Sequence, residues 1–360
     1  MSIDDPAHKP RKGRGATHAP NPRYLAFERD SFDDGWGTND ETPTPLRTTV
    51  TPERVRTVIN RNQSPDLPFN LSLNPYRGCE HGCSYCYARP AHAYVDLSPG
   101  LDFESRLFSK PDAPKVLREE LAKPSYRCET IALGANTDAY QPIERRLGIT
   151  RAILEVLNEC RHPVSIVTKS ALVERDIDLL TQLAAHNLVQ VFVSVTTLDR
   201  ELARRMEPRA AAPQRRVETL RRLAAAGIPT GVMFAPVIPA LNDHELERVL
   251  EHAAQAGCQH AGYVMLRLPR EVNPLFRDWL TTHYPLKFEH VMHRVQDVRG
   301  GRDNDSRFGQ RMKGEGVIAA LVAQRFARAC RSLGLSKSRH QLDTQWFKPP
   351  RADSAQLDLF

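Results

Sequence analysis

The stretch "NPYRGCEHGCSYCYARP" (residues 74–90) places three cysteines within eight residues. Cys79, Cys83 and Cys86 have the spacing C-x3-C-x2-C, and three thiolates on one short loop can surround one compact metal group. A structural zinc site normally has four protein ligands, and no later C-x2-C or H-x3-H pair supplies a fourth. A [4Fe–4S] cube offers four irons, so three cysteines leave one iron open to an external ligand. A zinc site that uses His81 is the alternative.

The cysteine loop follows the first of six short apolar runs that alternate with amphipathic segments. This alternation predicts a parallel sheet with right-handed crossovers, as an open doubly wound sheet or an incomplete barrel. In either case ligands are expected beyond the carboxyl ends of the strands. The expected strands are 70–76, 130–134, 164–169, 189–195, 230–237 and 262–268, and the expected helices include 150–160, 173–186, 214–226 and 243–256.

Composition suggests how the rest of the chain is organised. Residues 1–60 are rich in Pro, Gly and charge without steady periodicity and predict an extended, partly disordered basic arm. We expect a core over 61–270, a helical or irregular cap over 271–345 and a flexible tail over 346–360. The run "KPRKGRG" (9–15) could neutralise phosphates, although a solvated tail is the simpler interpretation.

The overall charge and hydropathy favour some partners and compartments over others. The net charge of +7 is compatible with a polyanionic partner such as DNA. No apolar window is long enough to predict a membrane-spanning helix. The first residues carry no secretory signal, so a cytoplasmic protein without membrane contact is expected.

The cysteine loop strongly resembles that of the radical S-adenosylmethionine superfamily. The resemblance implies a partial (β/α)6 TIM-type barrel, with an extended N-terminal arm and a helical C-terminal extension. It also implies a [4Fe–4S] cluster on the three cysteines, S-adenosylmethionine chelated to the open iron, and an electron donor such as flavodoxin or ferredoxin. In that family, cleavage of the sulfonium gives a 5′-deoxyadenosyl radical that abstracts a substrate hydrogen.

The resemblance extends to residues at the ends of later strands. It places Tyr85 near the adenine, and "LGANTD" (133–138) where the family has a glycine-rich motif, although the usual final Glu is missing. Tyr85 or Tyr87 could pass a radical. The residues expected to contact S-adenosylmethionine are Tyr85, Gly134, Asn136, Thr137, Lys169, Ser194, Glu207 and Arg209.

Within the superfamily, residues 70–268 resemble the branch named for DNA repair photolyases, whose known member is spore photoproduct lyase. The strings "TDAYQPIE", "VSVTTLD", "MEPRAAAPQRR" and "APVIPALND" carry this resemblance. One departure matters, because Asn136 stands where that lyase has a hydrogen-donating cysteine, and Cys128 precedes the strand. Repair of spore photoproduct itself is therefore not expected. A radical lyase acting on DNA, a radical enzyme acting on protein, RNA or a small molecule, and a non-catalytic DNA-binding module remain open.

Two further segments suggest partners. The region 298–316 mixes glycines, cations and one aromatic, which is typical of nucleic-acid contact, and a salt-bridged loop is the alternative. Its candidate residues are Arg299, Arg302, Arg307, Phe308, Arg311 and Lys313. The closing "QLDLF" (356–360) resembles the peptide by which repair proteins bind the bacterial β sliding clamp, and a short strand docking on its own domain is the alternative. Its candidate contacts are Gln356, Leu357, Leu359 and Phe360.

Overall fold

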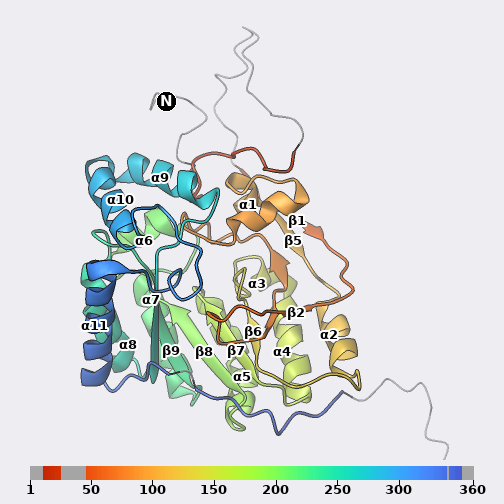
Figure 1. Ribbon diagram of the computed structural model, residues 1–360. Helices are drawn as coiled ribbons and strands as arrows, with labels where there is room; N and C mark the ends of the chain where they lie inside the picture. The colour runs from red at the N-terminus through yellow and green to blue at the C-terminus, as the bar shows by residue number, and fades with distance from the viewer. Residues whose placement is uncertain (1–10, 26–45, 339, 351–360) are drawn as a thin grey trace, which may run out of the picture.

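The computed structural model describes residues 11–25, 46–338 and 340–350 (Figure 1). Its main sheet has six parallel strands and an antiparallel edge strand, and it does not close into a barrel among the described residues. The strand order is β10-β9-β8-β7-β6-β3-β2. These strands are β2 (Ile59–Arg61), β3 (Leu71–Leu73), β6 (Ile131–Leu133), β7 (Val164–Thr168), β8 (Val189–Ser194), β9 (Thr230–Val237) and β10 (His260–Met265).

Helices that follow the parallel strands form the outer layer. They bury Leu, Ile and Val side chains against the sheet and so form the main core. The expected helices are present, although a 3-10 turn, η4 (Ala171–Asp176), replaces the start of the second. The helices of this layer are α2 (Ala113–Leu121), α4 (Ile149–Glu159), α5 (Ile177–Ala184), α7 (Pro213–Ala225), α8 (Leu246–Gln255) and α11 (Gly316–Ser332) (Figure 1).

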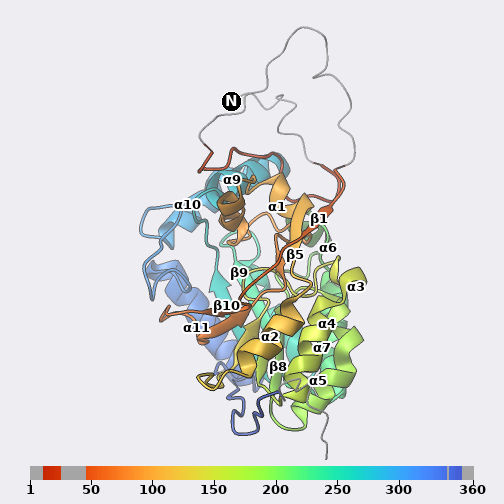
Figure 2. The same ribbon diagram turned by 90° about the vertical axis from the view of Figure 1, so that its right-hand side faces the viewer.

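A small second sheet stands beside the main one, and the sequence did not predict it. It has the order β1 (Thr49–Pro52), β5 (Arg106–Ser109), β4 (Tyr76–Arg77) (Figures 1 and 2). The expected strand 70–76 is split, because β3 ends at Leu73 and β4 belongs to the second sheet. Pro75 lies between them and has no N–H to continue a ladder. The chain therefore leaves the main sheet just before the cysteine loop.

Two C-terminal helices cover the carboxyl end of the sheet. α9 (Val272–His283) and α10 (Phe288–Asp297) form a second apolar cluster with Cys83, Tyr85 and α6 (Arg200–Met206). α11 instead lies beside α8, with Phe326 packed on Tyr263 of β10 at 4.7 Å between ring centroids. The expectation that all of 271–345 caps the sheet is therefore wrong for α11.

The described parts of the arm lie against the folded core. β1 pairs in parallel with β5, and β2 forms the edge of the main sheet. Arg14 donates hydrogen bonds to the carbonyls of Glu104 and Leu46, each at 2.6 Å. The interpretation of the basic run as solvated is therefore wrong for Arg14. Lys9 and the "QLDLF" residues lie outside the described residues. The expected domain boundaries remain a prediction.

The chain after α11 runs along the amino ends of the strands. Ser336 bridges His260 of β10, the Asp343 N–H donates to the Asn187 carbonyl at 3.0 Å, and the Lys348 N–H donates to the Cys160 carbonyl at 2.8 Å. Figure 1 shows this segment crossing below the sheet, opposite α9 and α1 (Leu101–Ser105). Within the described part of the chain, no helix is long and apolar enough to span a bilayer.

Candidate functional site

The cysteine loop is folded tightly at the carboxyl end of the sheet. All three thiols are free, with Cys79 and Cys83 buried and Cys86 partly exposed. Gly78 and Gly82 turn the loop at positive φ, 77° and 66°, where a side chain would be strained. A Cβ on Gly78 would lie 2.6 Å from a Leu107 methyl, so the loop also needs glycine for space.

The donor set of the loop fits an iron–sulfur cluster. A cube binds each cysteine to a different iron, so the sulfurs need not converge on one point. Among the described residues, no three His, Cys, Asp or Glu side chains are arranged to hold a single metal ion. His81, which the zinc alternative requires, places Nδ1 3.3 Å from Asp138 Oδ2. Burial raises the pKa of Cys79, and it raises that of Cys83 to about 12, so a cationic group must offset this cost for the thiolates to bind.

Gln141, from the string "TDAYQPIE", binds the backbone of the cysteine loop through its side-chain amide. Its amide oxygen accepts from the Glu80 N–H at 2.9 Å, and its amide nitrogen donates to the Gly78 carbonyl at 3.1 Å. Gln141 is fully buried, so both backbone groups would lack a partner without it. One side chain therefore fixes both residues that flank Cys79.

Asp138 joins the same loop to the end of β7. Its carboxylate accepts from Thr168 Oγ1 and from the Lys169 N–H, both at 2.8 Å, and lies beside His81. Burial alone would raise the pKa of Asp138, but His81 and the hydrogen bonds lower it to about 2. The carboxylate is therefore charged at neutral pH and holds two loops together.

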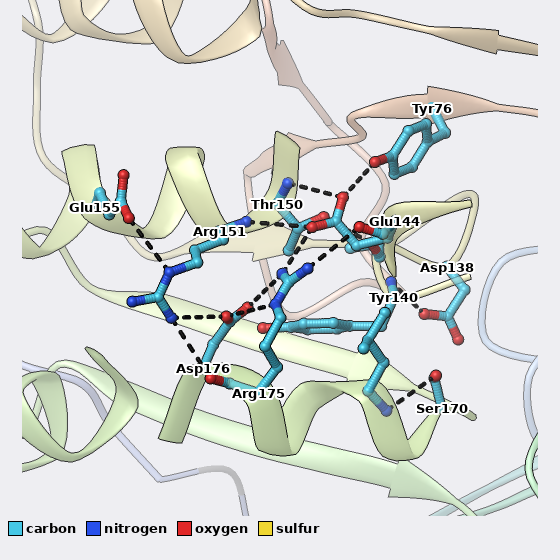
Figure 3. A network of polar contacts seen from close by, with 12 residues as sticks. Tyr76, Asp138, Tyr140, Glu144, Thr150, Arg151, Glu155, Ser170, Arg175 and Asp176 are labelled. Atoms are coloured by element: carbon cyan, nitrogen blue, oxygen red, sulfur yellow. Dashed lines mark hydrogen bonds and ion pairs between the residues drawn. The ribbon is translucent and has the colours of Figure 1, made fainter. Parts of the chain in front are cut away.

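A buried ionic network starts at the strand that precedes the cysteines (Figure 3). The Tyr76 hydroxyl donates to Glu144, which also accepts from the Thr150 N–H at 3.0 Å and pairs with Arg175 at 2.7 Å. Arg175 continues the network to Asp176. Three side chains of the string "TDAYQPIE", those of Asp138, Gln141 and Glu144, are therefore part of the polar support of the cysteine loop and its flanks.

The residues expected in the glycine-rich motif have mainly supporting roles. Gly134 has φ 79°, and a Cβ there would lie 3.2 Å from the Val167 carbonyl. The N–H groups of Asn136 and Thr137 point to Asn74 Oδ1, at 2.8 and 3.4 Å. The Thr137 side chain is buried and its hydroxyl donates to the Tyr76 carbonyl at 2.8 Å, whereas Asn136 is exposed.

Glu207 is occupied inside the protein. Its carboxylate accepts from the Tyr85 hydroxyl and from Thr196 Oγ1, and it pairs with the buried Arg216. Burial opposes ionisation, but Arg216 and Lys169 lower the pKa of Glu207 to about 2. Both oxygens of Glu207 therefore have buried partners within the protein, and its contact with S-adenosylmethionine stays a prediction.

The remaining residues expected to contact S-adenosylmethionine, which are Ser194, Arg209 and Lys169, have different surroundings. Ser194 is buried, and its carbonyl accepts from Arg216 Nη1 at 3.0 Å. Arg209 lies 2.9 Å from Glu80 in the cysteine loop, so its charge is engaged there. The Lys169 ammonium lies 5.8 Å from the centre of the Tyr85 ring, so it is a cation beside the cysteine loop.

Tyr87 marks the open side of this loop. Its side chain is 47% exposed and its hydroxyl donates to the Ala135 carbonyl, next to Asn136. The Arg267 guanidinium lies 5.4 Å from its ring centre. Arg267 lies two residues after the end of β10 and touches Met312 of the 298–316 region through Nη1 and Sδ, 3.6 Å apart. The cysteine loop and the basic region therefore meet at one edge.

Within the 298–316 region, the candidate cations behave differently. Arg299 is 1% exposed and donates to the carbonyls of Leu266, Gln310 and Arg311, so its assignment to nucleic-acid contact is wrong. Arg307 pairs with Asp305 and Glu315. Arg311 pairs with Asp66 at 2.6 Å and lies over the Phe308 ring, whereas Arg302, Phe308 and Lys313 are exposed.

Comparison with known proteins identifies the family. The model of the Radical SAM superfamily matches residues 73–253, which run from the last residue of β3 through the cysteine loop and past β9. The chain belongs to the radical SAM superfamily. The family implies a [4Fe–4S] cluster and S-adenosylmethionine, and the expected superfamily and α/β fold are confirmed.

The relatives place this radical SAM core among uncharacterised proteins. An uncharacterised protein of Mycobacterium tuberculosis is 40% identical over 221 residues, which cover 61% of this chain and 65% of the relative. One of Methanocaldococcus jannaschii is 28% identical, over 66% of this chain and 84% of the relative. The match thus spans just under two thirds of the mycobacterial protein's length.

A solved structure has the same fold. Spore photoproduct lyase complexed with dinucleoside spore photoproduct superposes with a TM-score of 0.57 at 13% identity, over 79% of this chain and 80% of that one. At this identity the likeness concerns the fold, including the parallel sheet of an incomplete barrel.

Proposed function

We propose that this protein is a radical S-adenosylmethionine enzyme, of a lyase-like repair type, that acts on DNA. Cys79, Cys83 and Cys86 would hold the [4Fe–4S] cluster, in line with their thiol chemistry and shared loop. When bound, the cluster supplies the electron that cleaves S-adenosylmethionine to a 5′-deoxyadenosyl radical. Lys169, beside Tyr85, provides a cation for the carboxylate of S-adenosylmethionine.

The observation that carries the substrate assignment is Arg267 at the open side of the cysteine loop. Burial and the neighbouring Arg311 lower the pKa of Arg267, so its charge is incompletely compensated. No ion pair to Arg267 occurs within the described ranges, and its neighbour Asp66 already accepts from Arg311 and from the Gly309 N–H. A phosphodiester would supply the missing negative charge, and two of its oxygens could accept from the planar guanidinium in a bidentate fork.

The residues around Arg267 also suit a nucleic-acid strand. Phe308 is 60% exposed and backed by Arg311 at 4.7 Å, which is the arrangement of a stacking platform for a base. Arg302 and Lys313 are exposed in the same region and can contact phosphates. These features favour DNA over a small uncharged substrate. A substrate of protein or RNA is the alternative.

The chemistry is tested by reconstituting the cluster anaerobically in the full chain and adding S-adenosylmethionine with a reductant. We expect 5′-deoxyadenosine in wild type and none when Cys83 is replaced by Ala. If wild type binds a cluster yet forms no 5′-deoxyadenosine, the protein is a binding module and the enzymatic proposal fails.

The substrate assignment is tested with Arg267→Gln in DNA-binding titrations over a salt series. We expect weaker binding and a salt slope reduced by about one phosphate contact. Arg222→Gln, on the outer face of α7 where Arg222 pairs with Glu174 and Glu218, is the matched control and should leave the slope unchanged. Equal slopes for Arg267→Gln and wild type would remove Arg267 from the DNA site.

Of the two tyrosines, Tyr87 is the better candidate to return a hydrogen atom to a product radical. The Tyr85 hydroxyl is bound to Glu207 in the interior, whereas that of Tyr87 lies at the open side beside Asn136. The phenol would lose one hydrogen atom to the product carbon. The resulting phenoxyl would regain one electron from a flavodoxin- or ferredoxin-type donor and one proton from water. Tyr87→Phe should slow product formation and spare 5′-deoxyadenosine formation, and unchanged product formation would contradict this role.

The sliding clamp is a separate proposed partner, through residues outside the described ranges. Deleting 356–360 should abolish binding to purified clamp and leave 5′-deoxyadenosine formation intact. Retained clamp binding after the deletion would exclude the "QLDLF" peptide as the contact.

A further inference from the structure

Residues 13–17, "GRGAT", lie across the cysteine loop and are bound there by one carboxylate. The N–H groups of Gly15 and Ala16 donate to the two oxygens of Glu104, at 2.9 and 2.8 Å. Gly15, Ala16 and Thr17 are buried, and Glu104, in α1, is completely so. A short segment far from the cysteines in sequence is thus held as firmly as a core element.

The same carboxylate connects this segment to the backbone of a cysteine. Glu104 pairs with Arg89, which is also completely buried. Arg89 donates through Nε and Nη2 to the Cys83 carbonyl, at 2.9 and 2.8 Å. A buried ion pair is stable only while its remaining donors and acceptors are satisfied. Two of the Glu104 hydrogen bonds come from residues 15 and 16, so the Arg89 contact with Cys83 depends on them.

Gly15 and Gly82 meet backbone to backbone. A Cβ on Gly15 would lie 1.6 Å from the Gly82 carbonyl oxygen, which the structure cannot accommodate without moving one of the two segments. A Cβ on Gly82 would in turn lie 2.7 Å from Glu104 Oε2. The φ of Gly15 is not in the left-handed region, so its backbone conformation does not require glycine. Glycine is needed here because a side chain would have no space beside Gly82.

A second connection runs through Arg14 to the other side of the loop. Arg14 binds the Leu46 carbonyl and Thr48 Oγ1, and the Thr48 hydroxyl donates to Glu80 at 2.7 Å. Glu80 directly follows Cys79, and Arg209 pairs with it from the far side. The segment is therefore connected to both ends of the Cys79–Cys83 turn, directly at Gly82 and through Thr48 at Glu80.

We propose that residues 13–17 form a strap that positions the cysteine loop and excludes water from it. The strap lies outside the region 73–253 that the superfamily model matches. Its importance for a cluster rests on the proposed function, whereas its effect on the loop does not.

The test is Gly15→Ala in the full chain, with the exposed neighbour Lys12→Ala as the control. In the metal-free protein, hydrogen exchange should become about tenfold faster for the amides of residues 79–89, the factor for losing one charge-assisted hydrogen bond. Exchange in α8 should stay unchanged. After anaerobic reconstitution, Gly15→Ala should retain less iron than Lys12→Ala and lose it faster in air.

The outcomes separate the strap from the proposed function. Unchanged exchange over 79–89 in Gly15→Ala, or an equal rise throughout the core, would overturn the strap. Glu104→Gln, which keeps the size of the side chain, should reproduce the local effect without adding a Cβ. A wild-type chain that takes up no iron would instead contradict the cluster, and the exchange result would still decide the strap.

Discussion

The cysteine loop and the 298–316 region have similar compositions and opposite environments. Both combine glycines with charged residues and one or more aromatics. In the cysteine loop, the buried side chains of Gln141 and Arg89 bind backbone groups, and the Arg209 N–H donates to the His81 carbonyl at 3.3 Å. In the 298–316 region Arg299 is buried and binds backbone carbonyls, whereas Arg302, Phe308 and Lys313 are exposed.

The difference teaches that glycine and arginine alone do not distinguish a scaffold from a binding surface. What distinguishes them is whether the cations meet backbone carbonyls and buried carboxylates or solvent. A rigid loop suits a cluster that must be held in one geometry, and an exposed loop suits a long, variable ligand. Four predictions, from the largest effect to the smallest, test this contrast.

The largest effect is expected for Arg89→Met, because it leaves the Glu104 carboxylate buried without its ion pair. The free energy of unfolding should fall by about 3–5 kcal/mol, measured by urea denaturation of the metal-free protein. Arg302→Met, in the exposed region, should change it by less than about 0.5 kcal/mol. Equal losses for the two variants would show that the cysteine loop is not the more firmly held of the two.

Gln141→Ala should cost about 2–3 kcal/mol, because the Gly78 carbonyl and the Glu80 N–H both lose a buried partner. Reconstituted iron content should fall with it. Gln296→Ala, which removes a contact to Asp303 near the exposed region, is the matched control and should leave the iron content unchanged. An iron content equal to that of wild type in Gln141→Ala would argue against this support.

Asp138 should make the attachment of the cysteine loop depend on acidity. Its pKa is lowered from 3.8 to about 2, so its contribution is complete above pH 3.8 and is lost as the pH falls towards 2. This amounts to about 2 kcal/mol. Urea denaturation at several pH values measures this. Between pH 3.8 and pH 2, the unfolding free energy of Asp138→Asn should fall less than that of wild type by this amount. Parallel pH profiles of the unfolding free energy in the two proteins would contradict the role of Asp138.

The smallest effect distinguishes two cations of the exposed region. Lys313→Gln should lower the salt slope of DNA binding, whereas Arg307→Gln should change it less, since Asp305 and Glu315 already neutralise Arg307. Titration of the same oligonucleotide at several salt concentrations measures both. A larger change for Arg307 than for Lys313 would mean that this ion-pair cluster opens on binding.

The sequence predicted the six parallel strands and the cysteine loop, because continuous β-branched runs and cysteine spacing are local signals. It missed β1 and β5, which are short strands without alternation, beside a turn-rich segment. It also misjudged Arg299, since nothing local to a charged residue tells whether distant backbone carbonyls will bind it. The role of Gln141 was equally hidden, because both of its partners lie about sixty residues earlier in the chain.

Residues 336–348 run along the amino ends of the strands, and this path determines where the residues after Pro350 can bind a partner. The described chain stops at Pro350, close to the carbonyl of Cys160 that binds Lys348, at the pole opposite the cysteine loop. Ten further residues, fully extended, reach at most about 35 Å from there. A partner bound to the last five residues would therefore lie on the side of the protein opposite the cysteine loop, away from the exposed Tyr87 and its neighbour Arg267.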